Sequence, residues 1–129
     1  MRVTKNRIII VDDNDYVRDQ LAQFLMLMGY EVESYKDGPT FLSNSIETIP
    51  SVIILDMRMP KMSGLELQKR IINMNRKSPI IFISGESEPQ EIIDAMKLGA
   101  IDFILKPFEI DDIISSIKRA IEIDMERAL

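Results

Sequence analysis

The sequence predicts an α/β protein in which five short parallel strands alternate with five helices. Five apolar runs of strand length recur along the 129-residue chain, and amphipathic patterns with helical spacing separate them. Glycine or proline stands near most of the boundaries between these segments. Alternation of this kind implies right-handed crossover connections and a parallel sheet that helices cover on both faces.

The first strand and the first helix have the clearest signals. Residues 8–11 are a continuous apolar run that stops at two aspartates, after which Asn14 or Asp15 can cap a helix. We expect this helix to end at Gly29. Its apolar residues recur at helical spacing: Val17, Leu21, Phe24, Leu25 and Met28.

The next segments are more polar. Residues 30–35 carry Glu31 and Glu33 on one face, which suits a strand near the edge of the sheet, where charges discourage pairing with other sheets. Residues 37–39, Asp-Gly-Pro, are interpreted as a turn. A short helix ending before Pro50 is expected to follow, on the basis of three apolar residues: Phe41, Leu42 and Ile46.

The remaining strands are of the type buried on both faces. They are predicted where apolar residues run without interruption, at 52–55, 79–83 and 103–105. A helix is expected after each of them, over residues 65–72, 88–98 and 110–121.

Polar side chains stand where four of these strands end. Asp12 and Asp13 follow the first strand, Asp56 the third, Ser84 the fourth and Lys106 the fifth. Because the carboxyl ends of parallel strands lie on one side of a sheet, we expect these residues to share one edge, the usual place for ligands in open α/β sheets. Taken alone, Asp56 is equally well explained as the cap of a turn.

Three carboxylates at one edge would repel each other and raise one another's proton affinity. A cation removes this repulsion, and a set of oxygen ligands suits Mg²⁺ better than zinc or copper. The pattern predicts phosphoryl chemistry with Asp56 as the nucleophile, Mg²⁺ as the bridge to the phosphoryl oxygens, and Lys106 and Ser84 as further contacts. The sequence has no Walker loop and no GxGxxG motif, so we expect the phosphoryl group to come from another molecule.

The composition excludes several other functions. The chain contains neither cysteine nor histidine, which rules out thiol and Ser-His-Asp catalysis, disulfides and the commonest transition-metal ligands. Its net charge of −5 argues against direct binding of nucleic acid. The N-terminus lacks the apolar core of a signal peptide and no apolar run reaches the length of a membrane span, so we expect a cytoplasmic protein.

Five short segments occur in order along the chain. They are Val-Asp-Asp at 11–13, Leu-Asp-Met-Arg-Met-Pro-Lys-Met-Ser-Gly at 55–64, Ser-Gly at 84–85, Ala-Met-Lys-Leu-Gly-Ala-Ile-Asp-Phe at 95–103 and Leu-Lys-Pro-Phe at 105–108. Together they resemble the receiver domain of bacterial two-component response regulators, over essentially the whole chain, and most closely the receivers of transcriptional regulators. The resemblance implies the CheY-like, flavodoxin-like (βα)5 fold with strand order 2-1-3-4-5.

The resemblance also implies a role for each site residue. Asp56 corresponds to the phosphoacceptor, which receives a phosphoryl group from a histidine kinase or a phosphotransfer protein. Asp12 and Asp13 correspond to the acidic pair that holds Mg²⁺ or Mn²⁺, and the backbone carbonyl of Arg58 to a further metal ligand. Ser84 corresponds to the switch hydroxyl, which moves toward the phosphoryl group.

Three further residues complete the implied set. Lys106 corresponds to the lysine of the site, and the peptide bond to Pro107 is expected to be cis. Phe103 occupies the aromatic switch position, with a plain core role as the alternative, since it has no hydroxyl to expose. Phosphorylation is then expected to reshape the surface formed by the fourth helix, the fifth strand and the fifth helix.

Arg58 and Glu86 stand two residues beyond Asp56 and Ser84, respectively. In this family the two positions affect how fast the phosphoryl group is lost. We expect the opposite charges of Arg58 and Glu86 to pair over the site and to hinder an attacking water.

Other interpretations of the same fold suit the residues less well. A flavodoxin-like FMN carrier needs a glycine- and hydroxyl-rich phosphate loop where residues 12–15 are mostly acidic. An aspartyl-phosphate phosphatase needs a second acid where Arg58 stands. Two alternatives remain open: an interaction module that no longer depends on phosphorylation, and a stand-alone single-domain regulator.

We expect one receiver domain over residues 1–124, followed at 125–129 by a helix end or the start of a linker to an output domain. Its expected output is control of transcription, with DNA binding by an output domain outside this chain. A second copy is expected to bind through the fourth helix, fifth strand and fifth helix, and no membrane contact is expected. The domain is expected to catalyse only its own phosphorylation and dephosphorylation, as a switch and not as an enzyme.

Overall fold

The computed structural model describes residues 6–47 and 50–127, in which strands and helices alternate. The strands are β1 (Arg7–Val11), β2 (Glu31–Tyr35), β3 (Ser51–Asp56), β4 (Ile80–Ser84) and β5 (Asp102–Leu105). The helices are α1 (Asp15–Leu27), α2 (Gly38–Asn44), α3 (Gly64–Asn73), α4 (Pro89–Lys97) and α5 (Ile110–Arg127).

The five strands form one parallel sheet in the order β2-β1-β3-β4-β5, which confirms the predicted fold class and strand order. β1 lies between β2 and β3, and its last residue, Val11, is opposite both Tyr35 of β2 and Leu55 of β3. This register brings the carboxyl ends of β1 and β3 level with each other. Residues that follow these two strands therefore emerge side by side.

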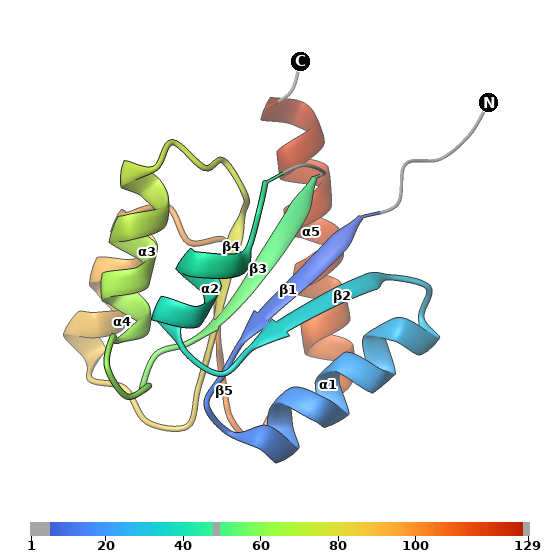
Figure 1. Cartoon of the computed structure of the whole chain (residues 1–129), viewed down its shortest axis with the longest axis horizontal. Helices are drawn as coiled ribbons and strands as arrows, with labels where there is room; N and C mark the ends of the chain where they lie inside the picture. The colour runs from blue at the N-terminus through green and yellow to red at the C-terminus, as the bar shows by residue number, and fades with distance from the viewer. Residues whose placement is uncertain (1–5, 48–49, 128–129) are drawn as a thin grey trace.

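Helices cover both faces of the sheet, with α1 and α5 on one face and α2, α3 and α4 on the other (Figure 1). The alternation of side chains along β1 divides the core accordingly. Ile8 and Ile10 pack with α1 and α5, whereas Ile9 and Val11 pack with α2, α3 and α4. Every residue of β3 and β4 is buried, which explains why their sequences are apolar from Val52 to Leu55 and from Ile80 to Ile83.

The segment before α2 differs from the prediction. Residues 37–39 are not a separate turn, because Asp37 is the N-cap of α2 and its carboxylate accepts a hydrogen bond from the Thr40 N–H at 2.8 Å. Pro39 lies in the first turn of the helix, where its missing N–H costs nothing. Ile46 lies beyond the end of α2 and is 66% exposed, so its assignment to the apolar face of this helix was wrong.

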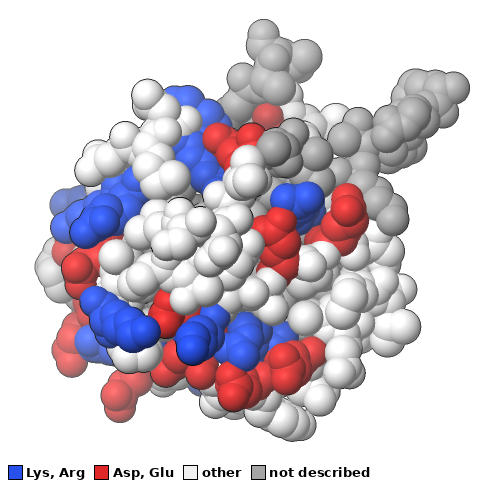
Figure 2. All heavy atoms as spheres, in the orientation of Figure 1, with Lys and Arg blue, Asp and Glu red and all other residues white. Residues whose placement is uncertain are grey.

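Acidic and basic side chains are interspersed over the face shown in Figure 2, where the described lysines and arginines do not form one continuous basic surface. The whole chain has 16 basic and 21 acidic residues, which give its net charge of −5. Among the described helices, none has the length and apolar character needed to cross a membrane.

Candidate functional site

The polar residues that follow the strands come together at one edge of the sheet. Asp12 and Asp13 directly follow β1, Asp56 and Ser84 are the last residues of β3 and β4, and Lys106 follows β5. An open cleft lies at this edge, and its lining combines acidic and basic side chains. The lining residues are Asp13, Asn14, Asp56, Arg58, Gly85, Glu86 and Lys106.

Three carboxylates lie close together at this edge. Asp12, Asp13 and Asp56 each offer an oxygen, and these oxygens all lie within 4.8 Å of one another. Asp12 and Asp56 are buried, whereas Asp13 is exposed. Burial, followed by repulsion from Asp12, raises the pKa of Asp56 to about 7, although the ammonium of Lys106 acts in the opposite direction. A group of carboxylate oxygens with one exposed member suits a hard divalent cation such as Mg²⁺ or Mn²⁺, which keeps some of its waters.

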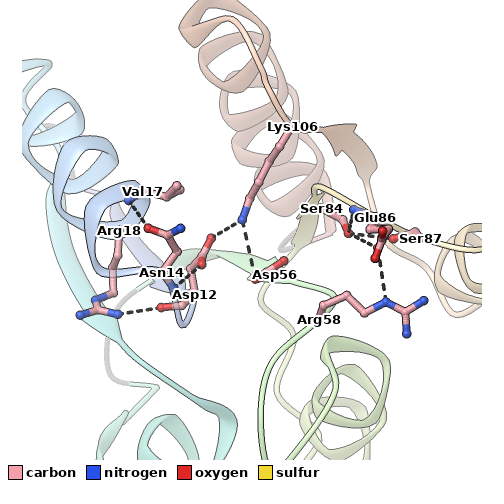
Figure 3. A network of polar contacts seen from close by, with 10 residues as sticks. All are labelled: Asp12, Asn14, Val17, Arg18, Asp56, Arg58, Ser84, Glu86, Ser87 and Lys106. Atoms are coloured by element: carbon pink, nitrogen blue, oxygen red, sulfur yellow. Dashed lines mark hydrogen bonds and ion pairs between the residues drawn. The ribbon is translucent and has the colours of Figure 1, made fainter.

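Lys106 provides a positive charge next to these carboxylates. Its Nζ lies 3.0 Å from Oδ2 of Asp12 and 3.7 Å from Oδ2 of Asp56 (Figure 3). The backbone N–H of Lys106 donates to the carbonyl of Ser84 at 2.7 Å, which fixes the point at which the chain leaves β5. The peptide bond between Lys106 and Pro107 is cis, the isomer that the resemblance implies.

Short polar side chains shape the connection between β1 and α1. Oδ1 of Asp12 accepts the N–H of Asn14 at 2.9 Å, and Oδ1 of Asn14 accepts the N–H of Val17 at 3.0 Å, which makes Asn14 the N-cap of α1. Arg18 donates to the backbone carbonyl of Asp12 at 2.7 Å (Figure 3). One carboxylate oxygen of Asp12 is therefore held by the loop, while the other contacts Lys106.

Gly64, the first residue of α3, lets the helix approach the end of β3 closely. Its N–H donates to the carbonyl of Met57 at 2.9 Å. A Cβ at this position would overlap the backbone oxygen of Asp56 and would stand only 2.9 Å from Cα of Met57. Only glycine fits here, so Gly64 fixes the path of the chain just after Asp56. In the sequence, Gly64 stands out only as part of a motif.

The side chain of Ser84 is fully buried and turned toward the β4–α4 loop. Its hydroxyl donates to the carbonyl of Glu86 at 2.9 Å and accepts from the N–H of Glu86 at 3.3 Å and from the hydroxyl of Ser87 at 2.8 Å (Figure 3). The hydrogen bonds of this hydroxyl therefore all go to the loop and not to Asp56. Ser87 was not among the predicted site residues, and its only signal in the sequence is a second hydroxyl three residues after Ser84.

Arg58 does not pair with the carboxylate of Glu86, so that expectation was wrong. Nε of Arg58 donates to the backbone carbonyl of Glu86 at 3.3 Å, and its Nη2 forms an ion pair of 2.8 Å with Glu91, in the first turn of α4. The carboxylate of Glu91 also accepts the N–H of Glu88 at 2.8 Å, which holds it close to the loop. Glu91 is therefore the better-placed anion for Arg58.

Phe103 lies on the face of the sheet that α2, α3 and α4 cover. Its half-buried ring stacks on Phe82 of β4, with ring centroids 5.5 Å apart and planes inclined by 17°. The two residues are opposite each other in the β4–β5 pairing. This stacking explains how Phe103 is packed, and its role as a switch remains a prediction.

An apolar groove of about 270 Å³, which was not predicted from the sequence, lies between α1 and the start of α5. Most of its lining residues belong to α1, and the others lie just before and at the start of α5. The lining residues are Tyr16, Val17, Gln20, Leu21, Phe24, Phe108 and Ile110. Tyr16 is 73% exposed although it is a large aromatic residue. Tyr16 is next to the predicted apolar residues of α1 but is not one of them. A large aromatic residue in that position can indicate an exposed apolar surface.

The model of the response regulator receiver domain matches residues 8–118, and the chain belongs to this family. The chain is 38% identical over 120 residues to the transcriptional regulatory protein FixJ of Rhizobium meliloti, an alignment that covers 93% of this chain and 59% of FixJ. It is 36% identical over 116 residues to the response regulator protein TmoT of Ectopseudomonas mendocina, with 90% of this chain and 53% of TmoT covered. The chain thus spans little more than half the length of these two relatives.

A solved structure, that of the response regulator StyR, is similar over almost the whole chain. The TM-score is 0.90 at 36% sequence identity, and the alignment covers 97% of this chain and 63% of StyR. The similarity to StyR over nearly all strands and helices therefore agrees with the receiver fold predicted from the sequence.

Proposed function

We propose that this chain is a phosphorylation-dependent signalling switch and that Asp56 is its phosphoacceptor. The observation that carries this proposal is the position of Asp56, a nearly buried carboxylate that lines an open cleft beside two further carboxylates and one ammonium group. A carboxylate oxygen of Asp56 attacks the phosphorus of a phosphohistidine, and the bond between phosphorus and the imidazole nitrogen breaks. An acyl phosphate forms on Asp56, and the imidazole leaves with the electron pair and takes up a proton.

Asp12, Asp13, one oxygen of Asp56 and the backbone carbonyl of Arg58 are proposed to hold Mg²⁺ or Mn²⁺. The proximity of the three carboxylate oxygens, and the exposure of Asp13 to water, support this set. The bound cation supplies positive charge for the carboxylates and for the incoming phosphoryl oxygens. The protein contributes the fixed positions of these oxygens at the ends of β1 and β3.

Lys106 and Ser84 are proposed to contact the other phosphoryl oxygens. The ammonium of Lys106 is already 3.7 Å from Asp56, so a small movement away from Asp12 brings its charge to a phosphoryl group. The hydroxyl of Ser84 has to turn away from the loop to do the same. Phe103 would then follow into the space that the moving loop leaves.

A histidine kinase or phosphotransfer protein is the proposed donor, and the apolar groove is its proposed docking surface. The groove borders the site through residues adjacent to it in sequence, since Val17 follows Asn14 within one turn and Phe108 lies two residues after Lys106. Replacing Tyr16 or Phe108 by Ala is expected to slow transfer from the protein donor. Phosphorylation by a small donor such as phosphoramidate should stay unchanged, since it needs no docking.

The proposed output is control of transcription by a further domain. The support comes from relatives that are described as transcriptional regulators. The alignment with FixJ, for example, covers only 59% of FixJ. The receiver would span residues 1–124. Of the expected helix end or start of a connection at 125–129, residues 125–127 belong to α5, and 128–129 lie outside the described residues. Phosphorylation would change the surface of α4, β5 and α5, through which two copies would associate, and DNA contacts would belong to the further domain. The receiver would act only on its own Asp56, and not as an enzyme on other molecules.

The test of the proposed function is the intact mass after incubation with phosphoramidate and Mg²⁺. A labile gain of one phosphoryl group is expected, which disappears in Asp56→Asn and without Mg²⁺. Asp19→Asn, which removes an exposed carboxylate of α1, is the matched control and should be phosphorylated normally. No gain in the unmodified protein would overturn the proposal and favour an interaction module that works without phosphorylation.

A further inference from the structure

The hydroxyl of Ser84 has no free hydrogen-bonding capacity in this structure. A serine hydroxyl has one donor and two acceptor positions. The donor is used on the carbonyl of Glu86, and the two acceptor positions take the N–H of Glu86 and the hydroxyl of Ser87. Since Ser84 is fully buried, solvent does not replace a lost partner at once. The arrangement therefore holds the hydroxyl in its present orientation.

The carbonyl of Glu86 is a second fixed point of the same network. It accepts both the hydroxyl of Ser84 at 2.9 Å and Nε of Arg58 at 3.3 Å (Figure 3). Arg58 is in turn held by its ion pair with Glu91 of α4. The β4–α4 loop is thereby tied to the segment after Asp56 and to the first turn of α4. Ser84 can therefore turn toward Asp56 only if its hydrogen bonds to this loop are broken.

We propose that Ser87 is a positioning residue that holds the Ser84 hydroxyl in the resting arrangement and so opposes phosphorylation. This inference rests on the proposed function, in which Ser84 donates to a phosphoryl oxygen. To do so, Ser84 must withdraw its only hydrogen from Glu86 and move away from the hydroxyl of Ser87. The Ser87 hydrogen bond, at 2.8 Å, is thus present before the change and lost after it. Removing it favours the phosphorylated arrangement.

The experiment compares the affinity for beryllofluoride, a non-covalent phosphoryl analogue, in the presence of Mg²⁺ by calorimetric titration. Ser87→Ala is expected to bind the analogue about threefold to tenfold more tightly, the effect of one neutral hydrogen bond that stabilises only the resting state. Ser87→Thr keeps the hydroxyl and should restore the affinity of the unmodified protein. Ser43→Ala removes an exposed hydroxyl of α2 and serves as the matched control.

A double-mutant cycle separates this role from a general loosening of the loop. In a Ser84→Ala background, where the partner hydroxyl is absent, Ser87→Ala should leave the affinity unchanged. The inference is overturned if Ser87→Ala alone has no effect or weakens binding, if Ser87→Thr behaves like Ser87→Ala, or if the gain persists without Ser84. If the proposed function itself is wrong, the unmodified protein will not bind the analogue. That result differs from the outcomes above, and it would also overturn the role of Ser87.

Discussion

The ammonium of Lys106 lies closer to Asp12 than to the proposed phosphoacceptor, at 3.0 Å from the carboxylate of Asp12. Asp12 is fully buried, and among the described residues Lys106 is the cation that pairs with it. The lysine therefore compensates a buried charge before any phosphoryl group is present. Its role in stability can be separated from its proposed role in phosphoryl transfer.

Lys106→Met is expected to destabilise the metal-free protein by about 2 kcal/mol, because the buried carboxylate of Asp12 loses its ion pair. The loss is moderate because Lys106 is partly exposed, so that water already weakens this ion pair. The loss should shrink when Mg²⁺ is added, because the cation supplies the missing positive charge. Chemical denaturation with and without Mg²⁺ measures both effects. Equal destabilisation under the two conditions would contradict this account of Lys106.

Asp13→Asn is expected to stabilise the metal-free protein by about 0.5 kcal/mol, because it removes one of three mutually repelling carboxylates and Asp13 itself is solvent-screened. The same change should reduce the rise in the melting temperature that we expect from Mg²⁺, since a proposed ligand is lost. Asp19→Asn makes the same change of charge away from the cleft and should leave the Mg²⁺ effect intact. Thermal unfolding over a series of Mg²⁺ concentrations tests the prediction, which fails if Asp13→Asn responds to Mg²⁺ as the unmodified protein does.

Gly64→Ala is expected to destabilise the protein by about 1 to 3 kcal/mol, the usual range for inserting an atom into a closely packed position. The added Cβ would overlap the backbone at Asp56 and Met57 and push α3 away from the end of β3. Gly85→Ala is the control, since its Cβ would meet Lys106 only at 3.9 Å. Urea denaturation of the two variants should differ clearly, and similar stabilities would show that α3 adapts without cost.

Asp37 gives the stability a pH dependence that is independent of the acidic cleft. Hydrogen bonds from Thr40, with a smaller contribution from Lys61, hold the pKa of Asp37 below its ordinary value of 3.8. This stabilisation is fully present above the unfolded pKa and is lost as the pH falls through the lower, folded pKa. Asp37→Asn keeps a good N-cap without the charge.

The free energies of unfolding of the unmodified protein and of Asp37→Asn should therefore differ most above about pH 5 and converge in acid. Denaturation at a series of pH values measures this difference. A difference that stays constant down to pH 2 would show that the charge of Asp37 does not contribute.

The strands were predictable because their residues obey local rules. The apolar runs at β1, β3 and β4 stop where a polar residue appears, and parallel topology alone then places Asp12, Asp56 and Ser84 at one edge. Asn14 was predictable as a cap for the same reason, since its hydrogen bond spans three residues. These features depend on a few neighbouring residues and on the order of the strands.

The contacts between loops were not predictable in this way. Arg58 was expected to meet the carboxylate of Glu86, but the first turn of α4 presents Glu91 instead. The distance along the chain from Arg58 to Glu91 is 33 residues, so the pairing depends on the packing of α4 and not on a local pattern. Ile46 was misassigned for a related reason, because a periodic apolar pattern does not show that a helix has already ended at Asn44.

β1 and β3 are hydrogen-bonded to a neighbouring strand on each side, and almost all their residues are shielded from water. Their amide protons should therefore exchange with solvent only when the whole domain unfolds, whereas the amide protons of the loop that carries Glu86 should exchange after local opening. Asp12 and Asp56 stand at the ends of these protected strands, whereas the partners of Ser84, Glu86 and Ser87, lie in the loop. The β4–α4 loop could thus rearrange repeatedly while the carboxylates of the cleft keep their geometry.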